Sequence, residues 1–127
     1  MKFQPDRSEG LNAITRHEPG RVWVGSTPFA HSIVLPWQGS VVDWEAGDFS
    51  ALTPGHFERI AALAPEVVIF GSGPRLRFPP ASHLRALIER RIGVETMDTA
   101  AACRTYNVLA SERRSVVAAL LLDAAPP

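Results

Sequence analysis

Cysteine, lysine and long apolar runs are scarce in this sequence of 127 residues. Cys103 is its one cysteine, which excludes an internal disulfide and a metal site made of several cysteines, and is compatible with a reducing compartment. The apolar run from Val116 to Leu122 is far shorter than the roughly 18 residues that indicate a membrane helix. The first residues lack the apolar core of a signal peptide. We therefore expect a cytoplasmic protein with no integral membrane segment.

The sequence also has no excess of positive or negative charge. The sequence has 13 basic and 13 acidic residues and a formal net charge of +0 at pH 7. This balance argues against a nucleic-acid-binding protein and against a polybasic membrane protein. The length is typical of one domain, so residues 1–127 are predicted to form a single domain with frayed ends at residues 1–10 and 123–127.

A glycine-containing segment that follows an apolar run is the feature around which the rest of the sequence is organised. Val67 to Phe70 is rich in β-branched side chains, which predicts a strand buried on both faces. Gly71-Ser72-Gly73-Pro74 ends this strand, because it accommodates positive φ and cannot continue a sheet. Ligands of open α/β sheets bind at the carboxyl ends of strands, so we expect any site near Gly71 to Arg77.

The N-terminal half is predicted to be mostly β-strand. The turn signal Glu18-Pro19-Gly20 indicates an antiparallel hairpin between the first two of four strand patterns. These patterns cover residues 11–17, 21–25, 32–35 and 40–44. All three tryptophans fall in this half, where they belong either to the core or to an exposed apolar patch for a partner; they are Trp23, Trp37 and Trp44.

Helical signals begin after residue 52. Apolar residues recur at helical spacing over residues 57–64, with Thr53 as N-cap and Pro54 at the first helical position. A second helix is predicted after Pro79-Pro80, with Gly93 at its C-terminus. Its inward face is expected to consist of Leu84, Leu87 and Ile88.

The remaining segments predict a βαβ unit followed by a helix and a strand. Val94 to Met97 is a strand that should run parallel to the strand before the glycine segment. Asp98 or Thr99 caps a third helix, whose inward residues are Ala102, Tyr106 and Leu109. Val116 to Leu122 is interpreted as a buried strand. The pattern predicts an α/β fold with a β-rich N-terminal half and a βαβ unit after it.

Two arginines make the glycine segment a candidate anion site. Arg75 and Arg77 are two residues apart, so in an extended loop they point the same way. They are then expected to clamp a carboxylate or phosphate beside free N–H groups of Ser72 and Gly73. Two solvated arginines that pair with Glu66 or Glu95 are the open alternative. The segment lacks the third glycine of a dinucleotide fingerprint and the Gly-Lys-Ser/Thr of a P-loop, so no nucleotide cofactor is predicted.

Cys103 is a second candidate for chemistry. Arg104 and a nearby helix N-terminus are features that lower the pKa of a thiol and make it nucleophilic. A catalytic cysteine also needs a base, and no histidine is placed by the sequence to serve it. A small buried thiol is therefore the preferred interpretation. The four histidines show no metal-binding spacing, so we predict no metal site and no catalytic residue.

Polar residues of the third helix are expected to share a cleft with the glycine segment. Asp98-Thr99 follows a strand that is predicted to be parallel to Val67 to Phe70, so it should lie beside Gly71. Tyr106 and Asn107 would add a polar edge to this cleft. For Tyr106 the preferred interpretation is a core position with its hydroxyl at the rim.

Four motifs in the second half occur in the order and spacing of a known family. They are Val67-Val68-Ile69-Phe70-Gly71-Ser72-Gly73, Met97-Asp98-Thr99, Ala102-Cys103-Arg104-Thr105-Tyr106-Asn107 with Leu109, Glu112 and Arg114, and Val117-Ala118-Ala119-Leu120-Leu121. On these residues the sequence resembles a small family of largely uncharacterised proteins that includes the mitochondrial NADH:ubiquinone oxidoreductase complex assembly factor 3.

The resemblance implies a three-layer α/β fold with a mixed central sheet, whose last strand runs antiparallel to its neighbours. It implies no established enzyme activity, a scaffold role in the assembly of respiratory complex I, and a common cleft for the glycine segment and Asp98 to Asn107. The sequence departs from the family at two positions. Ser72 stands where threonine is frequent, and Arg113 stands where glycine is common, so the turn before the last strand is expected to differ.

Three functions remain open on the sequence. The first is a non-enzymatic protein-binding or assembly-factor-like module with an unidentified protein partner. The second is a protein that binds a small anion, or an uncharacterised enzyme, with Arg75, Arg77 and Cys103 around the ligand. The third is a structural subunit that forms an oligomer through the tryptophan-containing half.

Overall fold

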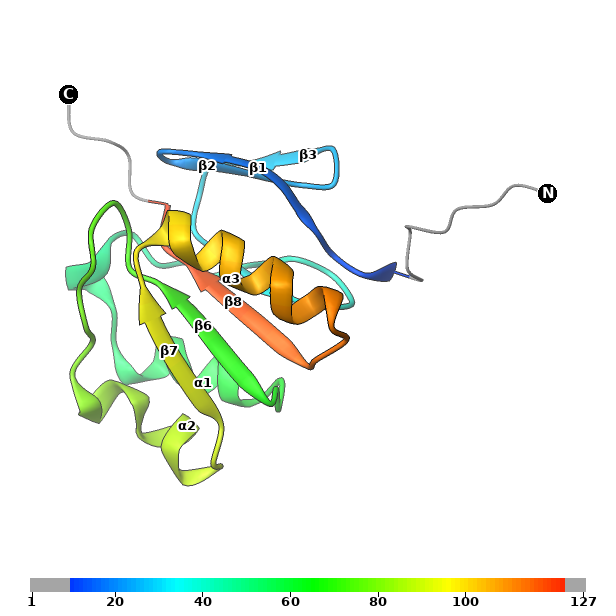
Figure 1. Cartoon of the computed structure of the whole chain (residues 1–127). Helices are drawn as coiled ribbons and strands as arrows, with labels where there is room; N and C mark the ends of the chain where they lie inside the picture. The colour runs from blue at the N-terminus through cyan, green and yellow to red at the C-terminus, as the bar shows by residue number, and fades with distance from the viewer. Residues whose placement is uncertain (1–9, 123–127) are drawn as a thin grey trace.

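The computed structural model of the protein describes residues 10–122, which form two β-sheets and three α-helices (Figure 1). Apart from Gly10, the ends predicted to be frayed lie outside these residues. The elements are β1 (Ile14–Glu18), β2 (Arg21–Val24), β3 (Thr27–Phe29), β4 (Ile33–Pro36), β5 (Val42–Asp43), η2 (Phe49–Ala51), α1 (Pro54–Ala61), β6 (Val67–Gly71), η3 (Ala81–Leu84), α2 (Arg85–Glu89), β7 (Gly93–Met97), α3 (Thr99–Ser111) and β8 (Val116–Leu120).

The larger sheet is mixed and has the strand order β5-β4-β8-β6-β7. β6 is parallel to both β7 and β8, while β4 is antiparallel to β5 and β8. The expected antiparallel last strand is therefore confirmed against β4 but not against β6. The reason is that α3 carries the chain from β7 back along one face of the sheet, and such a βαβ connection produces parallel strands.

Side chains that alternate along β6 divide the interior into two clusters, as expected for a strand buried on both faces. Val67 and Ile69 belong to the cluster beneath α3 and the smaller sheet. Val68 and Phe70 belong to the cluster beneath α1 and α2. The protein thus has three layers, with the larger sheet in the middle, and the predicted α/β fold class is confirmed (Figure 1).

The smaller sheet has the order β1-β2-β3 and is fully antiparallel. The predicted hairpin is β1 and β2, joined at Pro19 and Gly20. β3 was not predicted because it contains Pro28, which lacks a backbone donor and fits only an edge strand. The strand predicted over residues 40–44 shortens to β5, since Trp44 leaves the sheet and buries its ring in the core.

The second helix differs most from its prediction. One turn of 3₁₀-helix, η3, precedes the short α2, and its tighter winding rotates the faces that follow. Leu87 is therefore buried, whereas Ile88 is 58% exposed instead of facing inward. The left-handed residue that follows α2 is Arg91, at φ 58°, and the expected C-terminal glycine, Gly93, begins β7.

Candidate functional site

The start of α3 is fixed by Asp98. Its Oδ1 accepts a hydrogen bond of 2.9 Å from the backbone N–H of Ala101, so Asp98 is the N-cap and Thr99 the first helical residue. The Thr99 hydroxyl donates to the carbonyl of Leu121 and accepts from the N–H of Gly73, both at 2.9 Å. One side chain thus ties the glycine loop (residues 71–77), α3 and the end of β8 together.

Gly71 and Gly73 are each needed for a structural reason, close packing at Gly71 and a positive φ at Gly73. A β-carbon at Gly71 would lie 2.9 Å from Thr99 Oγ1 and 3.1 Å from the β-carbon of Ala102, which shows how closely β6 approaches α3. Gly73 has φ 105°, a conformation that residues with a side chain rarely adopt. These two positions are therefore structural as well as close to the candidate site.

The N–H groups that were expected to be open to an anion are already bonded. Ser72 N–H donates to the carbonyl of Met97 at 2.8 Å, and Gly73 N–H donates to Thr99 Oγ1. The buried hydroxyl of Ser72 donates to the Arg75 carbonyl at 2.8 Å and accepts from Arg77 N–H at 3.0 Å. The premise of free N–H donors was wrong, because the loop satisfies them internally.

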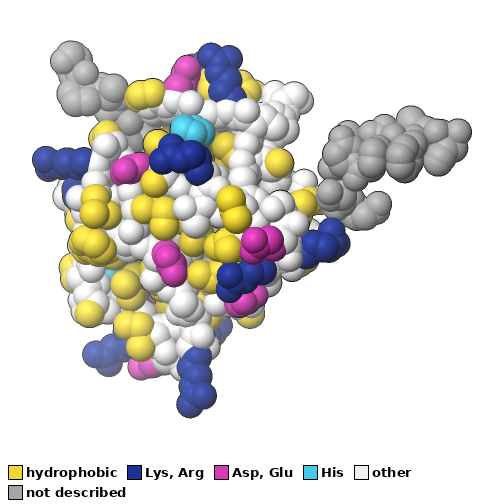
Figure 2. All heavy atoms as spheres, viewed as in Figure 1, with side chains coloured by type: hydrophobic (Ala, Val, Ile, Leu, Met, Phe, Trp, Pro, Cys, Tyr) yellow, Lys and Arg dark blue, Asp and Glu magenta, His cyan; other side chains and the backbone are white. Residues whose placement is uncertain are grey.

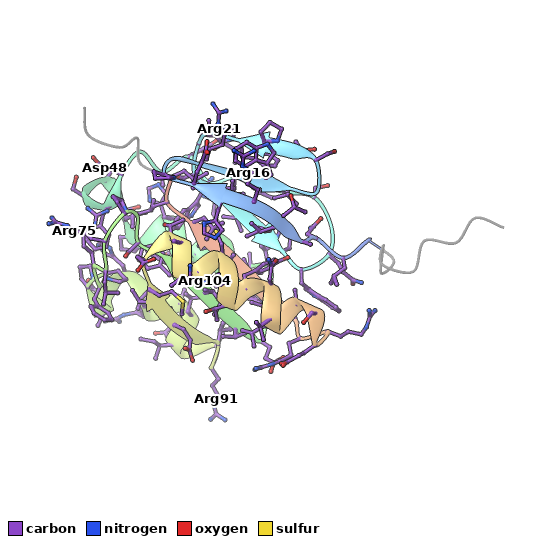
Figure 3. All side chains as sticks on the ribbon, turned by 45° about the horizontal axis from the view of Figure 1, so that its top comes forward. Arg16, Arg21, Asp48, Arg75, Arg91 and Arg104 are labelled. Atoms are coloured by element: carbon purple, nitrogen blue, oxygen red, sulfur yellow. The ribbon has the colours of Figure 1, made fainter. Side chains whose placement is uncertain are left out.

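The two loop arginines do not point the same way. The loop folds back on Ser72 rather than extending, and Arg77 turns inward, donating to the Ser72 carbonyl at 2.6 Å with its guanidinium 4.7 Å from the centre of the Phe49 ring. Arg75 is exposed and points away from the body of the molecule (Figure 3). A clamp made by both side chains is thus not present.

Arg77 also contributes to the electrostatics of the neighbouring η2. Hydrogen bonds from the Ser50 hydroxyl and the Ala51 N–H lower the pKa of the Asp48 carboxyl, with a smaller contribution from Arg77. The contact of Arg77 with η2 is made through the Phe49 ring.

A cavity of about 360 Å³ lies at the carboxyl ends of β6 and β8, beneath the turn of the β1–β2 hairpin. The hairpin contributes residues 17–20 and Val22, the loop Gly73 and Pro74, α3 residues 98–100, and the end of β8 Leu121 and Leu122. The cavity brings together three residues that were predicted to share a cleft: Gly73, Asp98 and Thr99.

The hairpin residues of this cavity were missed in the sequence. The turn signal at Glu18 was recognised, but the position of the hairpin over the sheet depends on contacts with residues about 90 positions later. Nothing local to Glu18 or His17 indicates that they face the start of α3. Of the other predicted site residues, none lines the cavity among the described residues; they are Gly71, Ser72, Arg75, Arg77, Arg104, Tyr106 and Asn107.

Tyr106 and Asn107 hold the N-terminal segment against α3, and we call this pair the clasp. The Tyr106 hydroxyl donates to the carbonyl of Asn12 at 2.7 Å. Asn107 Oδ1 accepts from Ile14 N–H at 2.9 Å, and its Nδ2 donates to the Ile14 carbonyl at 2.8 Å. The core position preferred for Tyr106 is confirmed, since its side chain is completely buried. Asn107 does not form an edge of the cleft, because its side-chain amide is bonded to the backbone of Ile14 in β1.

Burial makes the thiol of Cys103, on the inner face of α3, unreactive. Cys103 is completely buried, and desolvation raises the pKa of its thiol to about 12, against a smaller opposing effect of Arg104. The interpretation as a buried thiol is confirmed. Arg104 itself is exposed on α3 (Figure 3). Within residues 10–122, no group of three metal-ligating side chains occurs.

The surface shows no gathering of one kind of charge in the view of Figure 1. Figure 2 shows basic and acidic side chains scattered over this face, with hydrophobic side chains between them. This distribution agrees with the balanced composition. In the part of the chain that the structure describes, no helix is long and apolar enough to cross a membrane.

Comparison with known proteins identifies the family. A family model described as "Protein of unknown function (DUF498/DUF598)" matches residues 14–121. The chain belongs to this family. The matched region includes the strands of both sheets, all three α-helices and every residue that lines the cavity except Leu122.

The chain is also similar to a protein that is named as an assembly factor. The chain is 38% identical over 104 residues to the Bos taurus protein "NADH dehydrogenase [ubiquinone] 1 alpha subcomplex assembly factor 3". These residues make up 80% of this chain and 55% of the bovine protein. This chain therefore spans a little over half the length of that relative. The resemblance found in the motifs is confirmed.

Two bacterial proteins are similar over nearly their full length. The crystal structure of a Bordetella parapertussis protein is 38% identical with a TM-score of 0.85, covering 90% of this chain and 98% of that chain. The "13 kDa major membrane protein" of Francisella tularensis is 24% identical over 118 residues, covering 91% of this chain and 95% of that protein. With a relative so named, cytoplasmic location stays a prediction.

Proposed function

We propose that this chain is a non-enzymatic protein-binding module of the assembly-factor type, which engages its partner at the mouth of the cavity. The observation that carries the proposal is the 38% identity with the bovine assembly factor over 80% of this chain. By this likeness, the partner is a subunit or precursor of a respiratory complex. Only 55% of the bovine protein is aligned with this chain, so the proposal concerns the part of its role that this region performs.

The chemistry of the buried groups supports a binding role over a catalytic one. Burial keeps the Cys103 thiol protonated at neutral pH, and a protonated thiol is a poor nucleophile. Asp98 Oδ1 is engaged by the first turn of α3. The cavity, in contrast, has the size of a site for one anchoring side chain, at the low end of the roughly 300–1,000 Å³ typical of ligand pockets.

The alternative of an anion-binding site loses its main support. It required free N–H groups in the glycine loop and two convergent arginines. The N–H groups of Ser72 and Gly73 are bonded within the protein, and Arg77 is turned away from Arg75.

Affinity capture from native extract tests the proposal. Ala100 is exposed and lines the cavity, so Ala100→Leu fills its mouth with a residue that suits a helix. Val108→Leu is the matched control, because Val108 is a 55% exposed residue of the same helix that does not line the cavity. Both variants are first checked for wild-type folding by circular dichroism.

We expect the wild type and Val108→Leu to retain one partner at close to stoichiometric amounts. Ala100→Leu should retain at least tenfold less of it, measured by quantitative mass spectrometry. Equal recovery by all three proteins would place the partner elsewhere on the surface. If the wild type retains no partner, the protein-binding function is contradicted.

A further inference from the structure

His17 is a polar side chain of the cavity lining that has no partner within the described residues. In the register of the hairpin it lies opposite Val22, and side chains directly opposite one another share a face of the sheet. Val22 is completely buried beneath the smaller sheet, so His17 also faces the cavity. Its half-buried imidazole forms no hydrogen bond, ion pair or ring contact with any described residue. His17 is therefore available to an occupant of the cavity.

The polar groups of Gly73, Thr99 and Leu121, on the other walls of the cavity, are bonded within the protein. Gly73 N–H donates to Thr99 Oγ1, and the Gly73 carbonyl accepts from Thr99 N–H, both at 2.9 Å. The Leu121 carbonyl accepts from the Thr99 hydroxyl at 2.9 Å. Leu121 N–H donates to the Gly71 carbonyl at 3.0 Å. Because these groups gain nothing from a polar occupant, this side of the cavity favours an apolar one.

The lining favours an uncharged occupant. Glu18 is next to the inward-facing His17, so its side chain lies on the outer face of the hairpin, where it pairs with Arg16 at 3.5 Å. Arg21, opposite Glu18, points away from the body of the molecule (Figure 3). Asp98 Oδ1 is bonded to the first turn of α3, and the positive end of the helix offsets part of its charge. Among the described residues that line the cavity, none is lysine or arginine.

The apolar part of the lining has the size and shape for one ring. Val22 is completely buried, and Leu121 and Leu122 are 1% and 6% exposed. Pro19 of the hairpin turn and Pro74 of the glycine loop add two further apolar rings. The volume of about 360 Å³ is too large for a small polar side chain to fill and suits a single aromatic one.

We infer that the cavity binds the side chain of a tyrosine of the partner protein, with its ring against Val22 and Leu121 and its hydroxyl bonded to His17. This inference rests on the proposed protein-binding function and adds the chemistry of the anchoring side chain. A phenol hydroxyl both donates and accepts, so it bonds either tautomer of a neutral imidazole. Phenylalanine would leave His17 without a partner, and the indole of tryptophan only donates. Tyrosine is also a frequent anchor in protein interfaces.

Nuclear magnetic resonance titration with three small probes tests this chemistry. The probes are the N-acetyl amides of tyrosine, phenylalanine and leucine. We expect the tyrosine probe to shift the amide signals of Gly73, Ala100 and Leu121, and to bind at least about threefold more tightly than either of the others. Equal or tighter binding of the phenylalanine or leucine probe would overturn the inference, as would the absence of shifts at these residues.

Replacement of His17 tests the source of the selectivity. His17→Leu should bind the tyrosine and phenylalanine probes equally, because it removes the imidazole and keeps an apolar side chain in the strand. His31→Leu is the matched control and should keep the preference, since His31 is 56% exposed and does not line the cavity. A preference that survives in His17→Leu would overturn the inference. Should this variant not fold, the ring nitrogen signals of His17 in the wild type decide: equal shifts with both probes would contradict the hydrogen bond.

The outcomes separate this inference from the function on which it rests. Selective binding of the tyrosine probe without partner capture would refute the protein-binding function and leave the cavity chemistry supported. Partner capture that depends on Ala100, together with equal binding of the tyrosine and phenylalanine probes, would support the function and refute the hydrogen bond to His17.

Discussion

The two ends of one face of α3 have different surroundings: the first borders the cavity, and the second contacts the N-terminal segment. Thr99 and Tyr106 are seven residues apart, which is two turns of α3, so they lie on nearly the same side about 10 Å apart along the axis. At the first end, Asp98 and Thr99 border a cavity. At the second, Tyr106 and Asn107 are closed over by the N-terminal segment.

The difference comes from the smaller sheet rather than from the helix. Asn12 and Ile14 lie against the clasp and use its side chains as hydrogen-bond partners. Further along, β1 rises to the hairpin turn at Glu18, which stands over the start of α3 and leaves space beneath it. The hydrogen bonds of the clasp at one end of α3 thus help to position the hairpin turn that covers the cavity at the other end.

Among the substitutions that test this comparison, Asn107→Ala should lower the free energy of unfolding the most. It leaves both the N–H and the carbonyl of Ile14 without their partner, which costs about 2–3 kcal/mol of unfolding free energy. Urea denaturation measures the loss. Val108→Ala, at the exposed neighbouring position, is the control and should change stability by under about 0.5 kcal/mol. A loss below about 1 kcal/mol in Asn107→Ala would show that the clasp does not hold the smaller sheet.

Tyr106→Phe should cost less, about 1–2 kcal/mol, because it removes the hydroxyl that donates to the Asn12 carbonyl but keeps the ring. The two clasp substitutions share one segment, so their effects in a double variant should not add. Full additivity would mean that Tyr106 and Asn107 act on independent parts of the chain.

The same region should lose stability in alkali. Burial raises the pKa of Tyr106 above its ordinary 10.0 and that of Cys103 from 9.0 to about 12. Groups whose pKa is raised on folding contribute stability that is complete below the unfolded pKa and lost as pH rises towards the folded one. We expect unfolding free energy to fall between pH 9 and about 12, and to fall less steeply in Tyr106→Phe. A flat profile in the wild type would contradict this burial.

At the cavity end, Asp98→Ala should cost about 1 kcal/mol by removing the cap of α3, whereas Asp98→Asn should be nearly neutral. Thermal unfolding of the two variants measures the difference. Equal losses would mean that the charge of Asp98, rather than its hydrogen bond to Ala101, stabilises the helix start.

Arg113→Gly should produce the smallest effect, a gain of about 0.5–1 kcal/mol. Arg113 has φ 62° in the turn between α3 and β8, a conformation that glycine adopts without strain. The matched control is Arg113→Ala, which also removes the contact of the guanidinium with Trp37 at 5.9 Å but keeps the β-carbon. If both variants are equally stable, the left-handed conformation carries no cost at this turn.

The sequence predicted those features that depend on nearby residues. The β-branched run at Val67 and the cap at Asp98 carry their own signals, and both are found where they were expected.

Features that depend on distant contacts could not be predicted. Tyr106 and Asn12 are separated by 94 positions, so nothing in the helix pattern indicates that the hydroxyl faces the N-terminal segment. The direction of Arg77 is set by the Ser72 carbonyl and by Phe49 of a separate turn. The place of the hairpin turn over the start of α3 depends on equally distant contacts.

Photo-crosslinking from the two ends of the comparison tests the central claim most directly. A benzoylphenylalanine residue replaces Pro19, on the exposed roof of the cavity, or Val108, on the exposed side of α3 away from it. Both proteins are irradiated in native extract. We expect position 19 to crosslink to the captured partner and position 108 to give no such product. Crosslinking from position 108 alone would contradict a partner site at the cavity.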